Sequence, residues 1–204
     1  MGPKKAPPAK PPKQSVWEAT GVKPIGGMLK CADLACALLR RMRSAHPRTK
    51  MTVVLDIDDT VLHKNADDRV RAIPCMRTVY QTARDLKFAV GFVTARVDDR
   101  TRIAQRIATE DLTAAGYADW DFLRCTPESY ARKNKWAEFK HKARMDASKA
   151  FGTVVLAVGD NLWDVARDTE NNQLDALPRR VGWIGMVDGG ASVAGIKLPQ
   201  YDYA

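Results

Sequence analysis

The stretch that decides the fold is Met51-Thr52-Val53-Val54-Leu55, followed directly by Asp56-Ile57-Asp58-Asp59-Thr60-Val61. Its apolar, β-branched first half predicts a buried strand that ends where the acidic residues begin. Side chains alternate along an extended strand, so Asp56 and Asp58 share a face while Ile57 points the other way. Two carboxylates placed in this way can act as nucleophile and proton shuttle at one phosphate, beside a divalent metal ion. A strand followed by an acidic, solvated turn fits this stretch, taken alone, equally well.

The size and composition of the chain are those of one globular domain. It has 204 residues, of which 45% are hydrophobic and 28% are charged, enough for one sizeable core. No apolar run approaches the ~20 residues that a membrane-spanning helix needs, and prolines and lysines interrupt the N-terminus where a secretion signal would be apolar. The four cysteines form no CxxC pair and no metal-type spacing, which indicates reduced thiols. We therefore expect a cytoplasmic protein.

The positive charge is placed unevenly. Residues 1–50 hold 11 Lys and Arg against 2 acidic residues, whereas residues 51–204 hold 22 of each kind. The whole excess of +9 therefore precedes the acidic motif. We expect residues 1–24 to form a disordered, Pro/Lys-rich tail. A solubilising tail is the favoured interpretation, and an electrostatic tether to nucleic acid, an acidic protein or anionic lipid is the alternative.

Residues 25–50 predict an amphipathic helix. Its apolar positions form a broad stripe, and three arginines crowd its C-terminal end, where cations suit the helix dipole. Such a helix can lie on a membrane, but packing against the core is the commoner use and is the one we expect.

Residues 51–204 predict a single α/β domain. Strand-like runs occur at 51–57, 88–94, 120–125, 153–159 and 181–187, with helical patterns near 75–87, 98–115, 134–150 and 161–172 between them. This alternation predicts a three-layer, Rossmann-like fold with a mostly parallel five-stranded sheet. Ligands bind beyond the carboxyl ends of such strands, where Asp56, Thr94 and Asp160 fall. The Gly-containing stretch 188–204 predicts irregular packing or a tail.

Three further motifs follow the acidic one. Thr94-Ala95-Arg96 offers a hydroxyl, backbone N–H groups and a cation for phosphate oxygens. A lysine is needed to neutralise the nucleophile and the phosphoryl group, and four lysines compete for this role: Lys133, Lys135, Lys140 and Lys142. Gly159-Asp160-Asn161-Leu162-Trp163-Asp164 places two carboxylates one helical turn apart, where a hard cation could bind. Asp160 could instead merely cap a helix.

Together these motifs resemble the four motifs of the haloacid dehalogenase superfamily of phosphatases, in the same order. Within that superfamily the chain is similar to the acid phosphatases that include the plant acid phosphatases and class B-like enzymes. This finer resemblance rests on Thr94-Ala95-Arg96, on the 120–124 strand and on Phe139-Lys140-x-x-x-Arg144. Relatives carry this aromatic-Lys-x-x-x-Arg element about twenty residues before the metal aspartate, which favours Lys140 among the four lysines.

The resemblance implies a role for each motif residue. Asp56 would attack phosphorus to give an aspartyl-phosphate, and Asp58 would act as general acid and base. Thr94 and Lys140 would hold the phosphoryl group. Further substrate-binding positions would be Thr60, Ala95, Arg96 and Arg144. The cofactor would be Mg²⁺, held by Asp56, Asp58 through its backbone carbonyl, Asp160 and Asp164.

The spacing of the motifs leaves no room for a separate cap domain, so we expect a minimal or absent cap and an open site. The leading functional hypothesis is a Mg²⁺-dependent phosphomonoesterase. One alternative is a polynucleotide-end or phosphoprotein phosphatase, which a locally basic stretch at 124–144 with Tyr130 and Trp136 would suit. The other alternative is a non-catalytic binding protein that keeps the fold.

Overall fold

The computed structural model describes residues 27–64, 70–165, 184–188 and 191–198. The expected N-terminal tail (1–24) lies outside these residues. The described chain forms a six-stranded sheet, in the order β5-β4-β1-β6-β8-β7, and a separate two-stranded hairpin, β2-β3. The strands are β1 (Met51–Leu55), β2 (Leu62–Lys64), β3 (Val70–Ala72), β4 (Ala89–Asp98), β5 (Phe122–Pro127), β6 (Thr153–Gly159), β7 (Ile184–Asp188) and β8 (Ala191–Lys197).

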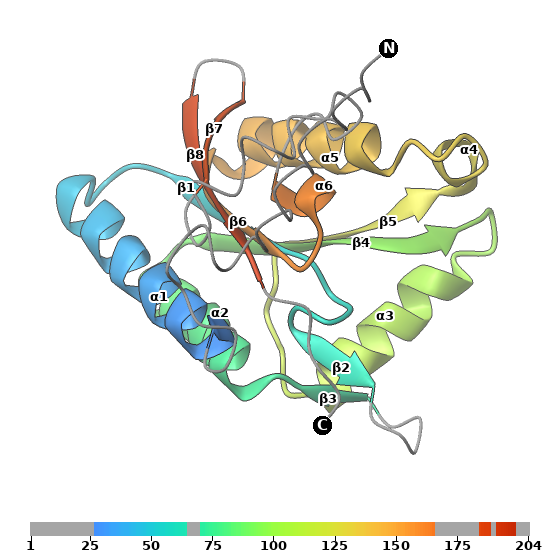
Figure 1. Ribbon diagram of the computed structural model, residues 1–204, viewed down its shortest axis with the longest axis horizontal. Coiled ribbons are helices and arrows are strands. Elements are labelled where there is room, and N and C mark those ends of the chain that lie inside the picture. The colour runs from blue at the N-terminus through green and yellow to red at the C-terminus, as the bar shows by residue number, and fades with distance from the viewer. Residues whose placement is uncertain (1–26, 65–69, 166–183, 189–190, 199–204) are drawn as a thin grey trace, which may run out of the picture.

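Helices cover both faces of the large sheet, which gives three layers (Figure 1). One face carries α1 (Gly27–Ala45), α2 (Pro74–Asp85) and α3 (Ile103–Ala114), and the other carries α5 (Trp136–Phe151) and α6 (Leu162–Val165), with the short α4 (Glu128–Ala131) beside them. The neighbours β5, β4, β1, β6 and β8 run parallel to one another. The predicted three-layer fold with a mostly parallel sheet is confirmed, and the sheet has six strands where five are expected.

The edge of the sheet beyond β6 differs from the prediction. The strand expected over 181–187 corresponds to β7, which pairs antiparallel with β8 at the edge; residues 181–183 lie outside the described chain. The fifth parallel strand is β8, in a stretch expected to be irregular. The glycine, alanines and serine of β8 have low intrinsic preference for strands. The segment forms a strand because the edge of β6 offers it backbone hydrogen-bond partners, which residue propensities do not take into account.

The central strand β1 is buried along its whole length, and its alternation decides which way the motif points. Val53 and Leu55 belong to the core under α1 and α2. Val54 faces the other way and packs in the cluster that contains Phe139 and Ala143 of α5. Asp56 follows Val54 by two residues and therefore points to the same face of the sheet, so its carboxylate is directed toward α5.

The helix α1 packs on the sheet through small and apolar side chains, among them Cys31, Ala35 and Leu39. At its end, the Arg43 guanidinium lies 4.6 Å from the centre of the Phe88 ring and donates to the carbonyl oxygen of Leu86. Part of its basic C-terminal end thus fastens α1 to the body of the fold. No helix among the described residues is both long and apolar enough to cross a membrane.

Candidate active site

The first motif leaves β1 as a tight loop pinned by Ile57. The Ile57 side chain is fully buried, and its carbonyl oxygen accepts the backbone N–H groups of Val61 and Leu62, both at 2.9 Å. Asp59 takes up a left-handed conformation with φ 54°, which Asp tolerates better than most residues. The backbone N–H of Asp56 still continues the sheet by donating to Val158 of β6. Asp56 is therefore held by both the sheet and the loop.

The fourth motif approaches the first from the end of β6. A Cβ on Gly159 would overlap the Cβ and the carboxylate of Asp164, so only glycine lets the Asp164 side chain fold back over the strand end. One Asp164 oxygen, Oδ2, accepts the backbone N–H of Asn161 at 2.8 Å. The Asp160 carboxylate accepts the Asn161 side-chain amide at 3.0 Å. The two aspartates are thus oriented by Asn161, between them in sequence.

Among the four candidate lysines, Lys140 is the one that the structure brings to Asp56. It lies on the buried face of α5 and is 2% exposed. Its Nζ donates to Asp56 Oδ1 at 2.6 Å and also to Asp164 Oδ1. By contrast Lys133, Lys135 and Lys142 are exposed, and the last two pair with Glu138 and Asp146. One ammonium therefore joins the first and fourth motifs.

Thr60 forms a second link between the two motifs. Its side chain is fully buried. The hydroxyl donates to Asp56 Oδ2 at 3.4 Å and accepts the backbone N–H of Asp160 at 3.1 Å. In the structure Thr60, expected from the sequence to bind substrate, is thus bonded to both motifs.

Arg144, also expected from the sequence to bind substrate, is bonded to the backbone of α6. It is 1% exposed, and its guanidinium donates to the backbone carbonyl oxygens of Trp163, at 3.2 Å, and Asp164, at 2.7 Å. These contacts tie the guanidinium to the backbone of α6. Arg144 thus secures α6, one turn along α5 from Lys140.

Asp58 belongs to a second polar group, which lies close enough for its charge to act on Asp56. Its carboxylate accepts Arg96 Nη2 at 2.7 Å and the Thr94 hydroxyl at 3.4 Å. Arg96 also pairs with Asp111 of α3, through Nη1 at 2.6 Å. Nothing in the sequence marks Asp111, because only the packing of α3 beside β4 brings it to Arg96.

The Thr94-Ala95-Arg96 motif lies within β4 and not at its end. The strand continues to Asp98, but its pairing with β5 is irregular between Thr94 and Val97. This irregularity takes Ala95 and Arg96 out of the ladder, as a bulge does. The Arg96 N–H turns back to the Thr94 hydroxyl at 3.1 Å. The segment therefore sits beside Asp58 despite being inside a strand.

The residues present fit a hard divalent cation. Asp56, Asp160 and Asp164 each offer a carboxylate oxygen, and these three atoms lie within 4.8 Å of one another. Three carboxylates against one Lys140 ammonium leave net negative charge in a largely buried pocket. Oxygen ligands of this kind are those that Mg²⁺ and Ca²⁺ prefer. The Asp58 carboxylate is not part of this group, so only its backbone carbonyl remains as a candidate ligand.

Burial and crowding of negative charge shift the ionisation of the cluster. Burial, together with the charge of Asp164, raises the pKa of Asp56 to about 7, although Lys140 acts in the opposite direction. Burial likewise raises the pKa of Asp160 to about 6 and raises that of Asp164. Burial alone would lower the pKa of Lys140, but Asp56 and Asp164 outweigh it and the pKa rises. The ammonium is shared by too many carboxylates to hold them all ionised at neutral pH.

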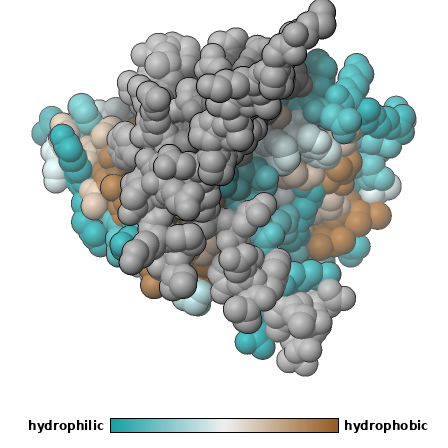
Figure 2. Space-filling view, viewed as in Figure 1, coloured by the Kyte–Doolittle hydropathy of each residue, from teal (hydrophilic) through white to brown (hydrophobic). Residues whose placement is uncertain are grey.

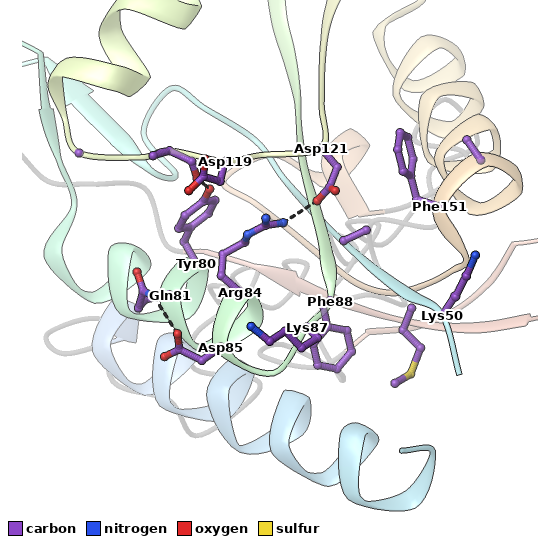
Figure 3. A pocket seen from close by; sticks show the side chains of 15 residues that line it. Lys50, Tyr80, Gln81, Arg84, Asp85, Lys87, Phe88, Asp119, Asp121 and Phe151 are labelled. Atoms are coloured by element: carbon purple, nitrogen blue, oxygen red, sulfur yellow. Dashed lines mark hydrogen bonds and ion pairs between the residues drawn. The ribbon is translucent and has the colours of Figure 1, made fainter. Parts of the chain in front are cut away.

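Two cavities lie toward opposite ends of the strands. One of about 500 Å³ opens beside Asp58 and Arg96, between the β2-β3 hairpin and α3. A larger one, of about 690 Å³, lies at the amino ends of β1, β4 and β5 (Figure 3). Its described lining includes no member of the carboxylate cluster, and its Arg84 pairs with Asp121 at 2.6 Å. The smaller cavity is the one that adjoins the predicted chemistry.

The basic stretch at 124–144 is largely neutralised by its own neighbours. Arg132 pairs with Glu128, in addition to the lysine pairs on α5 described above. Tyr130 packs against Phe139, with ring centres 5.7 Å apart. These contacts give no support to a nucleic-acid platform.

No protein-family model matches the chain, and no curated protein matches its sequence. Among solved structures, the class C acid phosphatase from Bacillus anthracis is similar, with a TM-score of 0.62 and 18% identity over 93% of this chain and 82% of that one. At this identity the likeness concerns the fold alone. The chain therefore shares a three-layer, Rossmann-like α/β fold with that enzyme.

Proposed function

We propose that this protein is a Mg²⁺-dependent phosphomonoesterase of the haloacid dehalogenase type that works through an aspartyl-phosphate on Asp56. The observation that carries the proposal is the contact of Lys140 with both Asp56 and Asp164 at the carboxyl ends of β1 and β6. Burying one ammonium and two carboxylates costs desolvation free energy. Charged groups that are buried together in this way are characteristic of functional sites.

The chain's own residues supply both half-reactions. An Asp56 oxygen attacks phosphorus, the bond from phosphorus to the ester oxygen breaks, and Asp58 gives that oxygen its proton. Asp58 then takes a proton from water, whose oxygen attacks the aspartyl-phosphate and releases inorganic phosphate and free Asp56. Lys140, Thr94 and the N–H group of Ala95 hold the phosphoryl oxygens. A loose phosphoryl transition state requires such positioning and charge neutralisation above all.

Asp56, Asp160, Asp164 and the backbone carbonyl of Asp58 would hold the metal ion. When bound, Mg²⁺ offsets the negative charge that the phosphoryl group brings to the carboxylates. The acid phosphatase resemblance within the superfamily belongs to this proposal as well. It agrees with the fold of the Bacillus anthracis enzyme.

The test is phosphate release from p-nitrophenyl phosphate by the wild type and by Asp56→Asn, each with Mg²⁺ and with a chelator. We expect turnover only for the wild type with Mg²⁺, and a loss of at least about 10³-fold in the variant. A similar change at exposed Asp146, Asp146→Asn, serves as the matched control and should retain full activity. Equal rates for the Asp56 variant and the wild type would overturn the proposal.

A further inference from the structure

The cavity beside Asp58 has walls of two kinds. The β2-β3 hairpin contributes Leu62 and Val70, and α3 contributes Ala104 and Ile107, so the body of the cavity is apolar. Its polar lining residues are Asp58, Asp59, His63, Lys64, Arg96 and Asp111. Because Asp58 is the proposed proton donor to the ester oxygen, the cavity lies where the alcohol part of a substrate would sit.

Apolar surface continues from the cavity onto the outside of α3. Ile107 is 43% exposed and Ile103, one turn earlier, is 49% exposed. Figure 2 shows hydrophobic surface gathered on the side of the molecule where α3 lies. Of the two, Ile107 lines the cavity and Ile103 does not. An exposed isoleucine at the mouth of a cavity is typical of a surface that an apolar ligand covers.

The charges of the cavity oppose a second anionic group. Among the described residues, its lining holds three carboxylates, those of Asp58, Asp59 and Asp111, against the cations of Lys64 and Arg96. Arg96 is bound by two of these carboxylates, to Asp58 at 2.7 Å and to Asp111 at 2.6 Å. Its guanidinium is therefore already neutralised, and an anion entering the cavity would meet net negative charge.

Resting on the proposed function, we infer that this cavity is the leaving-group site. It selects phosphomonoesters of apolar, uncharged alcohols, of which aryl esters are the simplest class. Its roughly 500 Å³ is in the range of small-molecule sites. Polyanionic substrates, nucleic-acid ends among them, are the class that it disfavours.

The first test compares two aryl esters of similar leaving-group acidity, 1-naphthyl phosphate and phenyl phosphate. Ile107→Ala should lower the ratio of their kcat/KM values by about threefold to tenfold, because trimming an apolar wall weakens the larger group's contact. Ile103→Ala is the matched control: it changes the same residue type on the same helix outside the cavity lining, and should leave the ratio unchanged. Equal effects at both positions, or none at Ile107, would overturn the inference.

The second test concerns charge and uses 4-carboxyphenyl phosphate against phenyl phosphate. The wild type should discriminate against the carboxylate. Asp111→Asn removes one negative charge and releases one arm of Arg96, so the discrimination should fall by about threefold or more. Discrimination that does not change in Asp111→Asn contradicts the electrostatic part of the inference.

Direct binding separates this inference from the proposed function. The fluorescence of 1-naphthyl phosphate can be titrated with wild type, Asp56→Asn and Ile107→Ala in the presence of Mg²⁺. Binding that weakens in Ile107→Ala, without turnover by the wild type, keeps the cavity assignment and rejects hydrolysis. Turnover that requires Asp56 but does not respond to Ile107 rejects the cavity assignment and keeps hydrolysis.

Discussion

Lys140 Nζ lies 2.6 Å from Asp56 Oδ1, although the two residues are 84 positions apart in the chain. Both are almost completely buried, at 2% and 6% side-chain exposure. The contact joins the centre of the sheet to α5, and the same ammonium reaches Asp164. It therefore has consequences for folding as well as for the proposed chemistry.

Replacing Lys140 should destabilise the fold. Lys140→Met keeps most of the aliphatic stem but leaves Asp56 and Asp164 buried without their cation, a change that costs about 3–5 kcal/mol in comparable pairs. Urea unfolding at pH 7.5 in chelator measures the loss. Lys133→Met, at an exposed position, is the control and should stay within about 0.5 kcal/mol of wild type. Wild-type stability in Lys140→Met would show that the buried pair contributes little.

The metal-free protein should become less stable as the pH rises from about 4 to about 7. The usual carboxyl pKa of 3.8 is raised to about 7 for Asp56 and to about 6 for Asp160 in the fold. The folded state therefore binds more protons than the unfolded state in this window, and the free energy of unfolding falls with pH. Thermal unfolding in chelator at pH 5 and pH 8 measures this trend.

Asp56→Asn should flatten that pH dependence, because it removes the carboxylate that ionises. Added Mg²⁺ should raise the wild-type unfolding temperature more at pH 8 than at pH 5, since the ion competes with protons for the same oxygens. A metal effect that is larger at pH 5 would contradict the assignment of these carboxylates to a cation.

Gly159→Ala should displace Asp164. A methyl group there would overlap the Asp164 side chain, and forced overlaps of this kind cost about 1–3 kcal/mol. The affinity for Mg²⁺, measured by calorimetry, should fall by about tenfold or more. In an Asp164→Ala background the same glycine change should have little further effect on metal affinity, because that ligand is already gone. If the effects of Gly159→Ala and Asp164→Ala on Mg²⁺ affinity were fully additive, the glycine change would not act through Asp164.

Thr60→Val should weaken the link between the first and fourth motifs. The change keeps the shape but leaves the backbone N–H of Asp160 without its acceptor and Asp56 without one donor. A buried unsatisfied group costs about 1–3 kcal/mol. Thr60→Ser, which restores the hydroxyl, should recover both stability and Mg²⁺ affinity. Failure of serine to rescue would mean that the Thr60 methyl group matters more than its hydroxyl.

Arg144→Met should lower stability without a specific effect on substrate binding. The guanidinium is bonded to the carbonyl oxygens of Trp163 and Asp164, and its removal takes this donor from both. At saturating Mg²⁺, the KM for p-nitrophenyl phosphate should change by less than about threefold. A large rise in KM at unchanged stability would return Arg144 to the substrate-binding role inferred from the sequence.

Much of the fold followed from local pattern. The β-branched run at 51–55 predicts the buried central strand, and the alternation of strand and helix after it predicts the layers. The edge at β8 was missed because Ala191–Lys197 carries no strand pattern of its own. Its strand state depends on the exposed backbone of β6, which is a non-local partner.

The sequence by itself determined that Asp56 and Asp160 lie at strand ends, because strand polarity and parallel pairing bring those ends to one edge of the sheet. Only the tertiary structure decided which lysine meets them, that Thr60 and Arg144 position other groups, and that Asp111 holds Arg96. Such contacts join residues up to 100 positions apart. They depend on how helices pack against the sheet, and no local periodicity encodes that choice.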